Sequence, residues 1–213
     1  MIKKLIHNLR RALHKTLLLS LLLSILVSGA RADHLVGGDI TWVCQGGGDY
    51  IFQLRLIMDC NGVITNSPTE DIQVWNHSSI TSVTVNYVID YDASPICSSS
   101  LGNNPISCTL GGVGAYSVFT YTSDPINMAG IPPSDGWIFT WSDFSRSGAI
   151  ENLDSPQTFG LTLISKMFNN AGANASPCYD SSPQFSNDLG ALYCVGDNQY
   201  VQKVIDPDAD SLV

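Results

Sequence analysis

The chain has 213 residues, of which 44% are hydrophobic and 14% charged, which excludes a disordered chain and is enough for one sizeable core. Its formal net charge is −9, and every acidic residue but only four basic ones follow residue 32: Arg55, Arg146, Lys166 and Lys203. A surface this acidic repels phosphate backbones, which argues against nucleic acid as a partner and favours divalent cations.

The first 32 residues have the order of a secretory signal peptide. A basic segment precedes a leucine-rich run from Leu17 to Val27, and Ala30-Arg31-Ala32 follows it. We therefore predict cleavage before Asp33 and export of residues 33–213, with no membrane span in the mature chain. The alternative is a membrane anchor, but the run has only about half of the roughly 20 residues that a spanning helix needs.

From residue 40 onward the chain shows the two-residue alternation of strands rather than a helical period. The clearest strand is Tyr50–Met58, in which every second residue from Tyr50 is apolar. The glycine-rich turn 46–49 predicts an antiparallel hairpin between this strand and the strand 40–44. The other expected strands are 72–75, 83–89, 116–121, 137–141 and 159–164. Seven short strands separated by turns predict an all-β, immunoglobulin-like sandwich over residues 33–168.

Composition changes near Asn169, where residues 169–177 are small and polar. Such a stretch predicts a linker or a long loop. The remaining residues, 178–213, are too few to bury a core alone. We expect them to begin a second, cadherin-like β module, so that the chain would be the front of a longer protein.

The six cysteines all follow the expected cleavage site: Cys44, Cys60, Cys97, Cys108, Cys178 and Cys194. An even number in an exported chain favours three disulfides. Their grouping into near neighbours suggests the pairs Cys44–Cys60, Cys97–Cys108 and Cys178–Cys194. A zinc site is the alternative, but it would need close C-x-x-C spacing and a neighbouring histidine, which the sequence lacks.

Asp206, Asp208 and Asp210 alternate near the end of the chain. Carboxylates at this spacing can converge on one hard cation, so calcium is the candidate cofactor. The stretch lacks the central glycine and distal glutamate of an EF-hand, and a solvated acidic turn remains the alternative.

Candidates for other chemistry are few. Neither His34 nor His77 lies in a nucleophile motif, so we expect turn histidines and a protein that is not an enzyme. Paired carboxylates of a glycosidase could be present, because sequence does not show which acids meet in space. Strand tryptophans are more often core than ligand contacts, and the chain has Trp42, Trp75, Trp137 and Trp141. Trp75, beside a polar turn, is the candidate for contact with carbohydrate.

Several segments together resemble the N-terminal region of large exported surface proteins of Bacteroidota. These proteins carry PKD or other immunoglobulin-like repeats and a gliding-motility-associated C-terminal sorting domain. The similar segments, in the same order, are His34–Trp42, Tyr50–Phe52, Met58–Gly62, Cys97–Cys108 before Gly114–Tyr116, Arg146–Leu153, Ser182–Phe185, Cys194 and Asp206–Val213. The chain departs from the pattern at Phe144-Ser145, where members often have two cysteines, and at Ala209, where they usually have glycine.

The resemblance implies a non-enzymatic structural or adhesive module at the cell surface, as the N-terminal part of a larger protein. It also implies export by the general pathway, followed by type IX secretion when a sorting domain is present. Surface glycans or neighbouring surface proteins would be the partners. The alternatives are a secreted carbohydrate-binding module and a fragment of a polysaccharide hydrolase.

Overall fold

The computed structural model describes residues 34–61, 67–95, 106–112, 114–144, 146–169, 177–185 and 204–208. The chain divides into two units, Met1–Arg31 and Ala32–Val213, and all described residues belong to the second. This described part contains β-strands and one 3-10 turn, Pro156–Thr158, and has no α-helix. The prediction of an all-β protein is therefore confirmed.

Eight strands form one antiparallel sheet. They are β1 (Leu35–Gly46), β2 (Asp49–Asp59), β3 (Thr69–Trp75), β4 (Ser82–Asp92), β5 (Tyr116–Thr122), β6 (Ile126–Asn127), β7 (Trp137–Phe144) and β8 (Gly160–Met167). The order is β1-β2-β5-β4-β3-β7-β8, and the short β6 pairs with β2. A separate pair consists of β9 (Gln184–Phe185) and β10 (Val204–Ile205). All seven strands expected from alternation are present, and the two-residue strands were not predicted.

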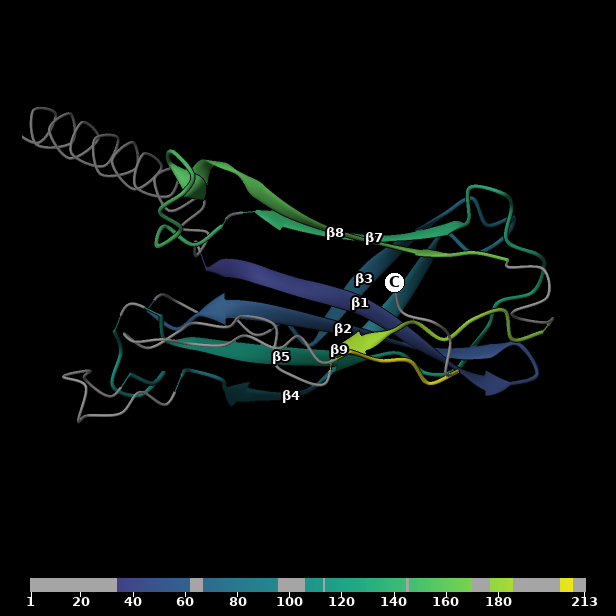
Figure 1. Ribbon diagram of the computed structural model, residues 1–213, viewed down its shortest axis with the longest axis horizontal. Helices are drawn as coiled ribbons and strands as arrows, with labels where there is room; N and C mark the ends of the chain where they lie inside the picture. Colours follow the sequence, from purple (N-terminus) through teal and green to yellow (C-terminus); the bar gives the residue numbers. More distant parts are fainter. Residues whose placement is uncertain are drawn as a thin grey trace, which may run out of the picture. The chain divides into compact units, whose positions relative to one another are not determined.

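The sheet folds over onto itself. In Figure 1, β7 and β8 lie in one layer, β1, β2, β5 and β4 lie in the other, and β3 leads between them. The two ends of the sheet, β1 and β8, lie close together. The Ser165 Oγ in β8 donates to the Ile40 carbonyl in β1 at 2.9 Å. Leu35 and Arg146 also form an isolated parallel bridge. The result is a nearly closed, barrel-like sandwich that is consistent with an immunoglobulin-like fold.

The hairpin of β1 and β2 confirms the glycine-based prediction. Gly46 pairs with Asp49, which leaves Gly47 and Gly48 as the two turn residues. Their φ angles are 66° and 86°. A two-residue hairpin that needs positive φ at both central positions favours glycine, because a Cβ strains that backbone conformation.

The core lies between the two layers, and the alternation in β2 fills it. Tyr50, Phe52, Leu54 and Leu56 are all 0% exposed. The Phe52 ring lies 4.9 Å from the ring of Phe139 on the opposite layer. The indoles of three tryptophans are buried as expected, namely Trp42, Trp137 and Trp141. The fourth, Trp75, is 56% exposed.

Residues 177–185 pack along β1, and residues 170–176 of the expected linker lie outside the described residues. Tyr179 is 3% exposed within the core, and its N–H donates to the Tyr50 hydroxyl at 2.7 Å. Ser182 exchanges hydrogen bonds with the backbone of Trp42, its Oγ accepting at 2.8 Å and its N–H donating at 2.9 Å. The physical reason is that β1 is a sheet edge, whose unpaired backbone groups need partners. Residues 186–203 and 209–213 of the expected module lie outside the described residues.

The predicted disulfide pairing is wrong. Cys44 pairs with Cys178 and Cys60 pairs with Cys108, with Cα–Cα distances of 5.8 and 5.1 Å. Cys44 lies near the turn of the β1–β2 hairpin, opposite Tyr50, whereas Cys60 follows the far end of β2. Ten residues of strand separate these ends by about 33 Å, and a disulfide needs Cα atoms within about 7 Å. Cys97 and Cys194 lie outside the described residues.

Candidate functional site

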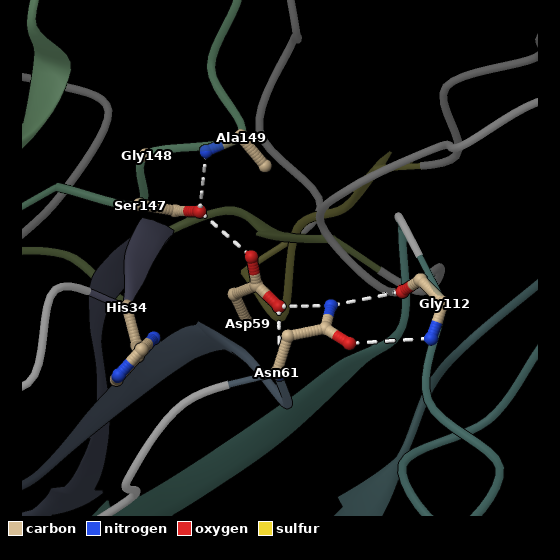
Figure 2. A pocket seen from close by; sticks show the side chains of 7 residues that line it. All are labelled: His34, Asp59, Asn61, Gly112, Ser147, Gly148 and Ala149. Carbon is tan, nitrogen blue, oxygen red and sulfur yellow. Dashed lines mark hydrogen bonds between the residues drawn. The ribbon is translucent and has the colours of Figure 1, made fainter.

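The candidate site is a cavity of about 450 Å³ beside Asp59, the last residue of β2. It is formed where the start of β1, the end of β2 and two loops meet. Its lining residues, drawn in Figure 2, are His34, Asp59, Asn61, Gly112, Ser147, Gly148 and Ala149. The lining contains the Asp59 carboxylate, the Ser147 hydroxyl and the His34 imidazole, which are the groups of a catalytic triad. Their relative positions determine whether they could act as one.

The Asp59 carboxylate is the centre of a hydrogen-bond network. Its Oδ2 accepts from the Ser147 Oγ at 2.7 Å, and its Oδ1 accepts from the backbone and side-chain nitrogens of Asn61 at 2.9 and 2.7 Å. The Asn61 amide continues the network to Gly112, donating to its carbonyl at 2.8 Å and accepting from its N–H at 3.2 Å. Asp59 is 8% exposed, and the three donors offset the free-energy cost of burying its carboxylate.

Ser147 is placed as a structural residue and not as a nucleophile. Its side chain is 1% exposed, and its Oγ both donates to Asp59 and accepts from the Ala149 N–H at 3.1 Å. In Figure 2 the His34 imidazole points away from this pair. A catalytic triad needs the imidazole between the hydroxyl and the carboxylate, and here serine and aspartate bond directly. The arrangement therefore joins two loops to the end of β2.

The network joins segments that are distant in the chain. Asp59 and Asn61 lie within Met58–Gly62 and Ser147 within Arg146–Leu153, while His34 contributes only its carbonyl, which accepts from the Asp59 N–H at 2.8 Å. Nothing in the sequence alone predicted a role for Asp59, Asn61 or Ser147. The spacing of Asp59 and Asn61 around a cysteine was the available signal, while their partner Ser147 lies 88 residues from Asp59 in the chain.

We expect Ser147→Ala to lower the free energy of unfolding by about 1–3 kcal/mol, because a buried carboxylate loses a donor and the Ala149 N–H loses an acceptor. Urea denaturation of the full chain measures this change. Ser142→Ala on β7 is the matched control, since Ser142 is exposed and its replacement should change stability by less than about 0.5 kcal/mol. Equal effects of the two replacements would contradict the structural role of Ser147.

His77 is a partly buried histidine rather than an exposed turn residue. Its Nδ1 accepts from the N–H groups of Ser79 and Ile80 at 3.2 and 3.0 Å, and its ring lies 4.7 Å from that of Trp137. Burial lowers the pKa of His77, and the Ala129 backbone acts in the opposite direction. Both contacts of Nδ1 hold the turn between β3 and β4, which is a structural use of the imidazole.

The acidic stretch near the end of the chain is described in part. The Asp208 Oδ2 accepts from the Ser181 N–H at 2.5 Å, and the Asp206 Oδ1 accepts from the Asp208 N–H at 2.8 Å. Asp210 lies outside the described residues. Across the described ranges, no three histidine, cysteine or acidic side chains cluster as a metal site would require. Calcium binding by this stretch stays a prediction.

Comparison with known proteins finds no match: no family model matches the chain, and neither does any curated protein or solved structure. Within the ranges that the structure describes, nothing helical has the length and hydropathy to cross a bilayer. The two disulfides are typical of an oxidising compartment outside the cytoplasm.

Proposed function

We propose that the chain is an exported, non-enzymatic structural or adhesive module of the cell surface, as part of a larger surface protein. The observation that carries the proposal is the Cys44–Cys178 disulfide, which joins the first hairpin to a segment 134 residues later. Such a long-range covalent closure suits a domain that must stay folded outside the cell.

The polar network supports a structural role over a catalytic one. The donors around Asp59 hold its carboxylate in place, and the Ser147 hydroxyl is buried and bonded on both sides. A reacting serine or aspartate needs an accessible atom with an unfilled hydrogen-bonding site toward the substrate. The hydrolase alternative therefore gains no support from this cavity.

The carbohydrate-binding alternative is favoured by one specific observation. Trp75 is 56% exposed, while the other three tryptophans are no more than 4% exposed. An exposed indole can stack on a sugar ring, so binding of glycans would be the adhesive activity of the module.

The proposed localisation rests on the first 32 residues and on the resemblance to Bacteroidota surface proteins. Export by the general pathway and onward transport by type IX secretion are both part of the proposal. The acidic charge of the chain would keep such a module soluble and repelled from phosphate polymers.

The test is fractionation of native cells with an antibody against residues 33–213. We expect a band at the cell surface, well above the 23.0 kDa of this chain. Protease treatment of intact cells should remove the band, whereas a cytoplasmic control protein should persist. A protease-resistant band in the cytoplasmic fraction would contradict export, and a surface band no larger than the chain would contradict the larger protein.

A further inference from the structure

The outward side of β3, β7 and β8 carries a group of exposed and half-buried residues. Trp75 pairs with Ile138 on β7, and Ile138 pairs with Lys166 on β8, which makes one row across the three strands. Thr140 and Ile164 lie in the next row, beside the exposed Gln73 of β3, and Phe168 follows Lys166 two residues on. We call these six residues the outer platform: Trp75, Ile138, Thr140, Ile164, Lys166 and Phe168.

The Trp75 ring is held against the sheet. Its Nε1 donates to the Thr140 Oγ1 at 2.9 Å, and Thr140 lies two residues beyond Ile138, its strand partner. The indole must therefore extend along β7 and not out into solvent. Because its only N–H is already used, the exposed surface of the ring can offer a ligand stacking contacts alone.

A second aromatic ring lies at the other side of the platform. Phe168 is 42% exposed, and its ring packs over Gly136, where a Cβ would lie 3.2 Å from two of its carbons. Trp75 on β3 is two strands away from β8, and Phe168 is two residues beyond Lys166, its counterpart in that row. From the spacing of strands and the rise per residue, the Cα atoms of Trp75 and Phe168 are about 12 Å apart. Two aromatic residues whose Cα atoms lie this far apart suit an extended chain of sugar rings better than a single sugar.

The charge of the platform differs from that of the chain. None of the six residues is acidic, although the chain has 19 acidic and 10 basic residues. Lys166 is exposed and forms no ion pair within the described part of the chain. Its ammonium can donate hydrogen bonds to ligand hydroxyls, while the negative charge of the rest of the chain repels acidic polymers.

We propose that the outer platform binds a neutral, extended polysaccharide. The proposal rests on the adhesive function above and names its ligand class. Stacking on Trp75 and Phe168 supplies the apolar contacts, and Lys166, in the same row as Trp75, can donate hydrogen bonds to ligand hydroxyls. A second copy of this chain could also bind exposed aromatic side chains, so the test below distinguishes it from a polysaccharide.

The test is affinity electrophoresis and titration of the full chain with two soluble neutral polymers, hydroxyethylcellulose and a galactomannan, and one acidic polymer, polygalacturonate. We expect binding to at least one neutral polymer, unchanged between low and high salt, with a shift in tryptophan emission from Trp75. Trp75→Ala should weaken binding about tenfold or more, which corresponds to about 1.4 kcal/mol.

Phe144→Ala is the matched control, since Phe144 is 45% exposed at the opposite end of β7. It should leave binding unchanged, and thermal unfolding should show that both variants remain folded. The proposal is overturned if neither neutral polymer binds, if binding survives Trp75→Ala, or if only polygalacturonate binds. A dimer by light scattering that Trp75→Ala dissociates would also overturn it, in favour of a second copy of this chain.

These outcomes are separable from those of the cell fractionation. A surface-exposed protein that binds no polysaccharide would refute the platform and leave the surface function standing. A cytoplasmic protein would refute the surface function whatever it binds.

Discussion

Cys178→Ser should lower the free energy of unfolding by about 2–5 kcal/mol, among the largest losses from a single replacement in this chain. The disulfide with Cys44 restricts the unfolded chain across 134 residues, which is a long loop. Its loss also removes the covalent anchor of residues 177–182 at the edge of β1, where Ser182 satisfies the backbone of Trp42. Urea denaturation under oxidising conditions, followed by circular dichroism, measures the change.

Cys44→Ser and the double replacement are the matched controls. Each removes the same bond, so the three variants should lose about the same stability, and the double variant excludes mispairing of a leftover thiol. Reduction of the wild-type protein should bring it toward the variants. A loss below about 0.5 kcal/mol in all three would show that the sandwich does not depend on this bond.

Phe52→Ala should cost about 3–5 kcal/mol, because it leaves a cavity in the centre of the core. Phe52 is 0% exposed, and its ring lies 4.9 Å from Phe139 and 6.2 Å from Trp42. Phe139 belongs to the layer of β7 and Trp42 to the layer of β1, so the replacement weakens the packing between the two layers. Thermal and urea unfolding measure the loss.

Phe159→Ala is the control for Phe52→Ala, since Phe159 is 53% exposed. We expect it to change stability by less than about 0.5 kcal/mol. Similar losses for the two phenylalanines would mean that the core is not centred on Phe52.

The strands and the main core could be predicted because their signals are local. Alternation from Tyr50 to Leu56 defines a buried face, and all four of these apolar residues are fully buried. The turn glycines Gly47 and Gly48 mark the hairpin, because few other residues accept their positive φ. Neither inference requires knowledge of which strands become neighbours.

The cysteine pairs and the polar network could not be predicted, because they depend on distant segments. Cys60 bonds to Cys108 and Asp59 to Ser147, at separations of 48 and 88 residues. Near-neighbour grouping failed for Cys44, since a stiff extended strand carries the chain away from a nearby cysteine instead of back toward it.

The sequence by itself determined that this is an all-β chain with a hairpin at Gly47-Gly48 and a core built on β2, because alternation and turn chemistry act within a few residues. Only the tertiary structure decided that residues 177–185 complete the sandwich, that Ser147 supports Asp59, and that Trp75 alone among the four tryptophans is exposed. The physical reason is that strand order sets which edges need partners and which faces are covered, and strand order is a property of the whole sheet.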